Sequence, residues 1–299
     1  MNILLTGAWK DAENYKPKLE GMGHNTAFLK QEKDELPCSY DWVEGVVCNG
    51  LFLFHPIERF KNLKYIQLTS AGYDRVPMEY IKKHNIEIHN AAGVYSVPMA
   101  EFAICGVLEL YKQSRFFHQN QKESKWEKHR ELLELCGKTV AIIGCGSVGT
   151  ECAKRFSAFD CTVLGVDLYP REDKAYTKIF GIDLLDDVIG NADIAVLTLP
   201  LTDLTRHLIN DERLKRLKNT AVLVNISRGA VIDTEALINR IPYIGGAVLD
   251  VFEEEPLSQS NPLWAMKNVI ITPHNSFVGE GNNKRLGQEI FKNFSCKII

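Results

Sequence analysis

The sequence predicts an α/β protein made of two doubly wound parallel-sheet domains. Short apolar runs alternate with helical segments along most of its 299 residues, which is typical of parallel sheets covered by helices. A glycine cluster with the pattern G-x-G-x-x-G, at 144–149, stands between a predicted strand and a predicted helix. The length allows two domains at roughly 100–200 residues each. A change in composition near Ser96 marks the first crossing between them.

The first part of the chain contains five predicted strands, and a turn of small residues follows the fourth. The strands are Asn2–Leu5, Thr26–Leu29, Gly45–Cys48, Tyr65–Leu68 and Ile86–His89, with helical segments at Tyr15–Gly23, Ile57–Lys61 and Met78–His84. The turn, Thr69–Asp74, stands where open α/β sheets bind ligands. An ordinary turn that needs a flexible glycine is the alternative interpretation.

The second part begins with a strongly apolar helix, predicted at Val97–Tyr111. The polar stretch after it, Lys112–Glu134, resembles a surface arm. The later predicted strands are Val140–Ile143, an apolar run that ends at Asp167, Ile194–Leu199, Ala221–Ile226, Ala247–Val251 and Val269–Thr272. Helices are predicted at Asp183–Ile189, Leu208–Leu217, Thr234–Arg240 and Asn282–Ile299, and the last of them could return to the first domain.

The composition is that of an ordinary globular protein. Hydrophobic residues make up 45% and charged residues 24%, and the net charge of −3 does not favour nucleic-acid binding. No C-x-x-C pair occurs among the cysteines, which favours free thiols over disulfides or a zinc site. They are Cys38, Cys48, Cys105, Cys136, Cys145, Cys152, Cys161 and Cys296. Without a signal peptide or a membrane-length apolar run, we expect a cytoplasmic protein with no metal and no nucleic-acid or membrane partner.

The glycine cluster predicts a dinucleotide site. In this pattern the glycines allow a tight turn, close approach to a pyrophosphate and close packing of helix on strand. The helix that begins near Ser147 would direct its N–H groups at the phosphates. Asp167 follows Gly149 at close to the roughly 20-residue spacing at which a carboxylate binds the adenosine ribose.

Three later strand ends carry side chains suited to acid–base chemistry. They are Arg228, the glutamates at 253–255 and His274, and in a parallel sheet all three loops open on the dinucleotide edge. Arginine can bind a carboxylate in a bidentate pair, and histidine can transfer a proton near neutral pH. A nearby carboxylate can orient the imidazole. Each residue alone is more often structural, but their joint placement favours reversible hydride transfer to a 2-keto acid.

In their order along the chain, these motifs resemble those of the D-isomer-specific 2-hydroxyacid dehydrogenases, NAD-dependent enzymes that interconvert 2-keto acids and D-2-hydroxy acids. The matching pieces are Ala71–Asp74, Gly137–Gly149, Leu199–Thr202, Asn225–Asp233, Leu249–Leu257 and Thr272–His274. The resemblance implies two Rossmann-like or flavodoxin-like domains with a cleft between them. It assigns 1–96 with 276–299 to a substrate-binding domain and 97–275 to an NAD-binding domain. It also implies a homodimer through the NAD-binding domain, with Lys112–Glu134 as an arm.

The resemblance further implies a role for each matching residue. Arg228 would anchor the substrate's carboxylate and carbonyl, His274 would donate the proton in reduction, and Glu255 would orient His274. The backbone N–H groups around Ala71 and Gly72 would hold the carboxylate of a small 2-keto or 2-hydroxy acid. NAD(H) would be held by Gly144, Gly146, Ser147, Val148 and Gly149 at the pyrophosphate, Asp167 at the ribose, Leu199, Pro200 and Thr205 near the adenosine half, Ile226 and Ser227 near the nicotinamide, and Asp250 at the carboxamide.

Several alternatives stay open at this stage. An NAD(H)-sensing scaffold like the corepressors of this fold, or a short phosphoglycerate dehydrogenase, would share most of these motifs. The apolar run Leu51–Phe54 would suit a larger 2-keto acid, although core packing explains it equally well. Asp167 favours NAD over NADP by charge repulsion, whereas the nearby Arg171 weakens that preference. Thr198 stands where many relatives have histidine, which could alter packing beside the cofactor.

Overall fold

The computed structural model describes residues 1–295, which form two compact units. The first unit contains Met1–Tyr95 and the chain from Gly279 onward, and the second contains Ser96–Val278. Each unit is described by itself below. Cys296 and the end of the predicted last helix lie outside the described residues.

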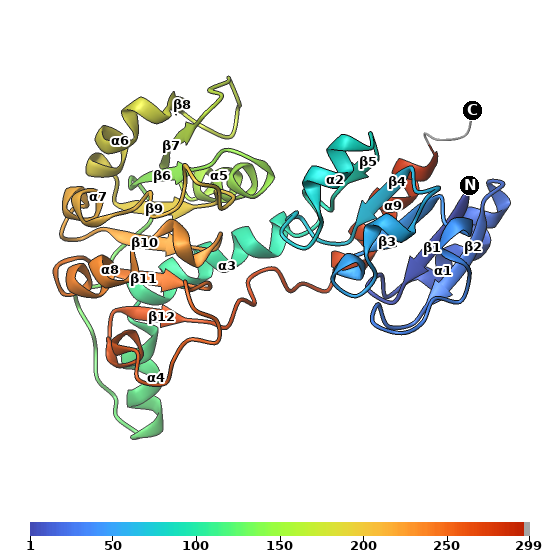
Figure 1. Cartoon of the computed structure of the whole chain (residues 1–299). Coiled ribbons are helices and arrows are strands. Elements are labelled where there is room, and N and C mark those ends of the chain that lie inside the picture. Colours follow the sequence, from blue (N-terminus) through green and yellow to red (C-terminus); the bar gives the residue numbers. More distant parts are fainter. Residues whose placement is uncertain (296–299) are drawn as a thin grey trace. The chain divides into compact units, whose positions relative to one another are not determined.

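The first unit is a five-stranded parallel sheet in the order β2-β1-β3-β4-β5 (Figure 1). This is the strand order of flavodoxin-like folds. Its strands are β1 (Asn2–Thr6), β2 (Asn25–Leu29), β3 (Gly45–Cys48), β4 (Tyr65–Leu68) and β5 (Glu87–His89), and its helices are α1 (Ala12–Gly21), α2 (Met78–Lys83) and α9 (Asn282–Ser295).

Successive residues of β1 enter opposite layers of the first core. Ile3 and Leu5 pack on the side covered by α1 and α9, together with Phe294 of α9. Leu4 packs on the other side, together with Ile81 of α2. Ile3, Leu4 and Leu5 are all fully buried. This is why the strand is a continuous apolar run in the sequence rather than an alternating one. The final helix therefore completes the core of the first unit.

The point at which the first sheet reverses its strand order, between β1 and β3, is occupied by Glu32. Its carboxylate accepts hydrogen bonds from the N–H groups of Asn49 and Gly50 at 2.7 Å, and from the hydroxyl of Thr6 at 2.9 Å. In this fold that crevice commonly binds a ligand. In this unit the protein's own carboxylate uses the donors that an anion would need.

The second unit is a seven-stranded parallel sheet in the order β8-β7-β6-β9-β10-β11-β12 (Figure 1). This is the dinucleotide-binding strand order with one added strand. Its strands are β6 (Thr139–Ile143), β7 (Thr162–Asp167), β8 (Lys178–Gly181), β9 (Ile194–Leu197), β10 (Val222–Asn225), β11 (Gly246–Leu249) and β12 (Val269–Ile271). Its helices are α3 (Ser96–Tyr111), α4 (Ser114–Lys122), α5 (Ser147–Ala158), α6 (Leu185–Asn191), α7 (Asp211–Arg216) and α8 (Thr234–Arg240). The two sheets confirm the predicted fold class.

Helices cover both faces of the second sheet. Ile142 packs in the layer that contains Phe156 of α5 and Val107 of α3, whereas Ile143 packs in the layer of α6, α7 and α8. Helix α3 approaches the sheet closely at Gly106, where a Cβ atom would lie 2.5 Å from a methyl group of Val248. Glycine at this position therefore lets the apolar helix lie directly on the sheet.

The second unit differs from the prediction at one helix and at one strand. The helix predicted at Leu208–Leu217 begins only at Asp211, because the Asn210 side chain caps it by accepting a hydrogen bond from the N–H of Arg213 at 3.1 Å. Before the cap, Leu208 lies in a bend and Ile209 pairs in parallel with Ile232. Strand β8 was not predicted. It is a short edge strand in which only Ile179 is buried.

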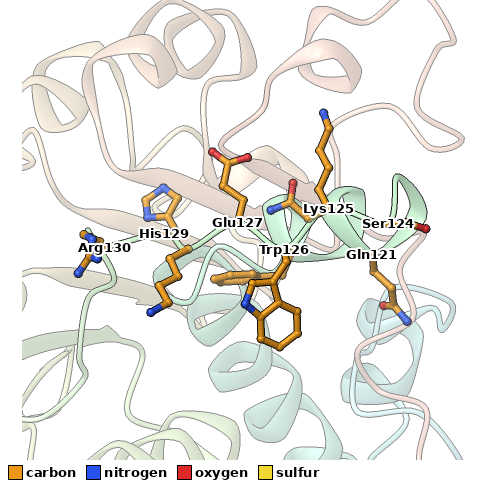
Figure 2. Close-up of a pocket in the computed structure, with 10 residues that line it drawn as sticks. Gln121, Ser124, Lys125, Trp126, Glu127, His129 and Arg130 are labelled. Atoms are coloured by element: carbon orange, nitrogen blue, oxygen red, sulfur yellow. The ribbon is translucent and has the colours of Figure 1, made fainter.

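The polar stretch 112–134 forms an arm whose two ends meet. The N–H of Leu133 donates to the carbonyl of Tyr111 at 3.1 Å, and the Lys112 ammonium donates to the carbonyl of Leu133 at 2.6 Å. Helix α4 lies within the arm, although the sequence predicted no helix there. Residues of α4 and the segment 124–130 line a hollow of about 800 Å³ (Figure 2). In that view the side chains of Trp126 and Glu127 point in opposite directions, and Trp126 is 98% exposed.

Within residues 1–295 no helix is long and apolar enough to cross a membrane. The seven cysteines of the same range are all free.

We expect Phe156→Ala to destabilise the second unit strongly. Phe156 is fully buried between α5 and the sheet, so its truncation should lower the free energy of unfolding by about 3–5 kcal/mol. Phe159, at the end of the same helix, is 42% exposed, and Phe159→Ala should cost under about 1 kcal/mol. Urea denaturation of both variants checks this, and equal losses would contradict the packing described.

Candidate active site

The glycine loop joins β6 to α5 and contains the first backbone feature of the site. Gly144 has a φ of +96°, which favours glycine, and its N–H donates to the carbonyl of Val166 at 2.8 Å. A Cβ atom at Gly149 would lie 2.2 Å from the carbonyl oxygen of Gly144, so glycine lets the helix approach the turn. A Cβ at Gly146 would meet nothing within 4 Å. Gly146 and Ser147 are exposed, and Ser147 and Val148 begin the first turn of α5.

This loop lies where the seven-stranded sheet reverses its order, between β6 and β9. Ligands bind at such points in α/β sheets. Thr198, directly after β9, donates from its hydroxyl to the carbonyl of Gly144 at 2.5 Å. Leu199 follows, with a methyl group 3.0 Å from where a Cβ of Gly144 would stand. Thr198 and Leu199 therefore form the second wall of the crevice, and the Thr198 hydroxyl holds the two walls together.

Thr205 shapes the loop beyond Leu199. It is only 9% exposed, and its hydroxyl donates to the carbonyl of Pro200 at 2.7 Å and accepts from the N–H of Thr202 at 2.8 Å. These bonds close the Pro200–Thr205 turn. The predicted contacts of Leu199, Pro200 and Thr205 with the adenosine half of the cofactor stay a prediction.

Two residues of opposite charge lie beside the glycine loop. Each oxygen of the Asp167 carboxylate accepts one backbone bond, from Cys145 at 2.7 Å and from Tyr169 at 3.0 Å, and each can accept another. The guanidinium of Arg171 donates to the carbonyl of Cys145 and lies 3.8 Å from Asp173. Burial raises the pKa of the Cys145 thiol to about 11, so the cysteine inside the glycine pattern stays neutral at pH 7.

Arg228 follows β10 in a loop that Asn225 shapes. Asn225 is 1% exposed, and its side-chain oxygen accepts from the N–H and the hydroxyl of Ser227 at 3.1 and 2.8 Å. Its amide nitrogen donates to the carbonyl of Arg228 at 3.0 Å. The Arg228 guanidinium donates to the carbonyl of Ser227 at 2.8 Å. Ile226 and Ser227 are both buried beneath the loop, so Asn225 sets the direction in which the arginine leaves the strand.

Glu255 and His274 are in contact. One carboxylate oxygen of Glu255 lies 2.9 Å from Nδ1 of His274, and the other accepts from the N–H of Phe252 at 3.0 Å. His274 has a φ of +50°, and its N–H donates to the carbonyl of Asp250 at 2.7 Å. Glu255 therefore engages Nδ1 of the imidazole, and the predicted contact of His274 with a substrate stays a prediction.

Asp250 holds the segment on both sides of His274. Its side chain is fully buried and accepts three hydrogen bonds. They come from the hydroxyl of Thr272 at 2.7 Å, the N–H of Asn275 at 2.7 Å and the N–H of Ser276 at 2.9 Å. The sequence predicted only a carboxamide contact for Asp250, and that contact stays a prediction. Apart from the position of Asp250 at the end of a strand, nothing in the sequence predicted the structural role that these bonds show.

In the first unit, the turn after β4 presents backbone donors. The carbonyl of Ala71 accepts from the Asn90 side chain at 2.6 Å, and the carbonyl of Gly72 accepts from the Ser70 hydroxyl at 3.1 Å. Within residues 1–295, the N–H groups of Ala71 and Gly72 donate no hydrogen bond. Both carbonyls are therefore engaged by the protein, and the predicted binding of a carboxylate by the two N–H groups stays a prediction.

The structure thus gathers most of the predicted residues in one unit. Asp167 ends β7, the glycine loop, Leu199, Arg228, Glu255 and His274 follow other strands of the seven-stranded sheet, and Ala71 and Gly72 belong to the first unit. Within the described residues, no group of three or more His, Cys, Asp or Glu side chains is arranged to hold a metal.

Comparison with known families matches residues 104–276 to the NAD binding domain of the D-isomer specific 2-hydroxyacid dehydrogenases. The chain belongs to this family. It is accordingly an NAD(P)-dependent oxidoreductase that acts on 2-hydroxy acids. The residues that the family model covers include the glycine loop, Arg228, Glu255 and His274.

Individual relatives agree with this assignment. The chain is 37% identical over 222 residues to a glyoxylate reductase of Thermofilum pendens, an alignment that covers 71% of this chain and 65% of that protein. It is 31% identical over 279 residues to a glyoxylate reductase of Korarchaeum cryptofilum, covering 87% and 83%. Among solved structures, a D-lactate dehydrogenase from Aquifex aeolicus, complexed with NAD and lactic acid, superposes with a TM-score of 0.78. That match has 26% identity and covers 99% of this chain and 95% of the other.

Substitutions at two glycines of this dehydrogenase should separate folding from cofactor binding. Gly149→Ala places a methyl group against the Gly144 carbonyl, so it should lower the thermal unfolding temperature. Gly146→Ala meets open space, so it should leave that temperature unchanged yet weaken NADH binding, because glycine here allows close approach to the pyrophosphate. Thermal unfolding and a fluorescence titration with NADH measure the two effects. Unweakened NADH binding by Gly146→Ala would contradict this description of the loop.

Proposed function

We propose that the protein reduces a small 2-keto acid to the D-2-hydroxy acid with NADH. The observation that carries the proposal is the 2.9 Å contact between Glu255 and His274, on loops that neighbour the Arg228 loop along the dinucleotide-binding sheet. An acid–base pair beside a carboxylate-binding arginine is the minimum that this reaction requires.

The residues of the second unit fit a dinucleotide. The open side of Gly146 gives a pyrophosphate room, and the N-terminus of α5 favours its charge. Asp167 keeps acceptor capacity for the ribose hydroxyls and repels a 2′-phosphate, which favours NAD(H). Arg171 beside the same turn is the residue that a 2′-phosphate would meet, so NADPH belongs in the assay as a comparison.

His274 is the proposed proton donor in reduction. Glu255 accepts the bond from Nδ1, which orients the ring, and Nε2 then gives its proton to the substrate's oxygen. Arg228 would polarise the carbonyl and hold the carboxylate. The N–H groups of Ala71 and Gly72 are further proposed ligands of that carboxylate, which makes the first unit the substrate-binding domain. Bound NADH supplies the hydride.

The substrate is proposed to be a small 2-keto acid of the glyoxylate type. Relatives of this chain are named glyoxylate reductase. One observation favours a larger apolar 2-keto acid as the second candidate. In the run that follows β3, Leu51 is buried, whereas Leu53 and Phe54 are 63% and 56% exposed. Two exposed apolar side chains on a short turn are suited to contact an apolar substrate.

The intact pair of Glu255 and His274 favours the enzyme over a scaffold protein that only senses NAD(H). The short phosphoglycerate dehydrogenase is tested in the same assay by including its phosphorylated 2-keto acid. The free cysteines fit the reducing cytoplasm that the sequence predicts.

A homodimer through the second unit is part of the proposal. The arm at 112–134 carries the indole of Trp126 almost wholly exposed, and large aromatic side chains are enriched at the centres of interfaces. A second copy of the chain is its proposed partner.

We expect His274→Asn to lower kcat by about 10²–10⁴-fold, the usual contribution of acid–base catalysis. The affinity for NADH should stay within about 2-fold, because no glycine-loop contact changes. Glu255→Gln should lower kcat by a smaller factor, since it keeps a hydrogen bond to the imidazole but removes the charge. Absorbance of NADH during turnover of a panel of 2-keto acids measures kcat, and titration measures affinity. Full activity in His274→Asn would refute the proton-donor role.

Trp126→Ala should weaken the proposed dimer. Loss of a central tryptophan commonly costs about 2 kcal/mol, so the dissociation constant should rise by about 30-fold. Tyr243 is 64% exposed outside the arm, and Tyr243→Ala is the matched control that should leave assembly unchanged. Light scattering over a dilution series measures both. A monomeric wild-type protein, or equal behaviour of the two variants, would reject the arm as the interface.

A further inference from the structure

Glu253 lies two residues before the catalytic Glu255, and its side chain joins three segments of the second unit. One carboxylate oxygen accepts from the N–H of Thr234 at 2.9 Å, where α8 begins. The other lies 2.8 Å from Nε2 of His207, in the loop between β9 and α7. The carboxylate therefore connects its own loop to two neighbouring loops.

The Arg228 loop is packed against the backbone beside Glu253. A Cβ atom at Gly229 would lie 1.8 Å from the carbonyl carbon of Phe252 and 2.3 Å from the nitrogen of Glu253. No side chain fits there. The loop that carries Arg228 and the loop that carries Glu255 thus touch backbone to backbone, and Glu253 lies at this contact.

His207 is itself held in place. Its φ is +50°, and its N–H donates to the carbonyl of Ala230 at 2.8 Å. The short parallel pairing of Ile209 with Ile232 continues this contact. The His207 loop is consequently attached to the Arg228 loop by backbone bonds and to the Glu255 loop by the imidazole.

The Glu253 side chain carries the negative charge that lets it accept both of these hydrogen bonds. Burial of the side chain works to raise the pKa of its carboxyl, but hydrogen bonds from Thr234 and His207 lower it by more, so the pKa lies below its usual value. The carboxylate is therefore ionised at neutral pH and can accept both bonds. The adjacent Glu254 makes no side-chain hydrogen bond or ion pair within residues 1–295.

We propose that Glu253, together with His207, is a positioning residue that holds the loops of Arg228 and Glu255 at a fixed separation. The proposal rests on the proposed function. Arg228 must meet the substrate's carboxylate while His274, oriented by Glu255, meets its carbonyl oxygen. A shift between the two loops would misplace the proton donor relative to a bound substrate, without altering the glycine loop.

The test compares Glu253→Ala with Glu254→Ala, which removes the same charge one residue away. Glu253→Ala should lower kcat by about 10-fold, within the 10²-fold that a misplacement of 1 Å can cost, while the KM for NADH stays within about 2-fold. Glu253→Gln keeps an acceptor for the Thr234 N–H and a donor for the imidazole, so it should restore kcat to within about 3-fold of the wild type. Glu254→Ala should behave as wild type.

A double-mutant cycle with His207→Ala adds a readout that general destabilisation would not move. The two single variants should lose similar activity, and the double variant should lose little more, because both remove the same contact. Strictly additive losses, or a Glu253→Ala protein with the kcat of Glu254→Ala, would overturn the proposal.

Hydrogen exchange of the full chain distinguishes this proposal from the proposed function. In Glu253→Ala, peptides that cover 228–234 and 252–257 should exchange faster, and those of the glycine loop should not. Unchanged exchange in the first two peptides would reject the positioning role. If the wild type reduces no 2-keto acid, the proposed function fails, and the exchange result alone decides whether Glu253 holds the two loops.

Discussion

The site depends on the register of three parallel strands. Asn225 of β10 pairs with Leu249 of β11, and Leu249 pairs with Ile271 of β12. Parallel strands that end at the same level release their loops side by side at one edge of the sheet. That register is why the loops that carry Arg228, Glu255 and His274 leave adjacent strands at one edge, although they come from separate parts of the sequence. A slip of one residue would turn the buried side chains of a strand to the other face, so the two cores enforce the register.

Buried and half-buried carboxylates then fix the loops that leave these strands. Asp250 accepts three bonds from the segment around His274, Glu253 binds the N–H of Thr234 and the imidazole of His207 in the loops after β10 and β9, and Asp167 accepts the N–H of Cys145 in the glycine turn. Bonds from backbone N–H groups to a charged acceptor are stronger than those between neutral groups, and a buried carboxylate needs them. The same acids therefore link the loops of the candidate site through hydrogen bonds within the protein. In the first unit, Glu32 likewise accepts backbone hydrogen bonds, from Asn49 and Gly50, at the crevice between β1 and β3.

The fold could be predicted because its strands are buried on both faces and read as apolar runs between glycine turns. The catalytic candidates could be named because Arg228, Glu255 and His274 sit in recognisable motifs at strand ends. What escaped prediction depends on distant contacts. Leu208 and Ile209 look helical until Ile209 pairs with Ile232, and β8 is an edge strand with only partial burial. The partnership of His207 with Glu253, 46 residues apart, leaves no local pattern in the sequence.

The central claim is that this family member moves a hydride from NADH to the keto carbon while His274 delivers a proton. The most direct measurement incubates the wild-type protein with NADH that carries deuterium at both C4 positions of the nicotinamide and a panel of 2-keto acids, and then determines the label and the configuration of the product. We predict deuterium at C2 of a D-2-hydroxy acid, formed by the wild type and not by His274→Asn. An unlabelled product, an L-configured product, or tight NADH binding without any product would contradict the account.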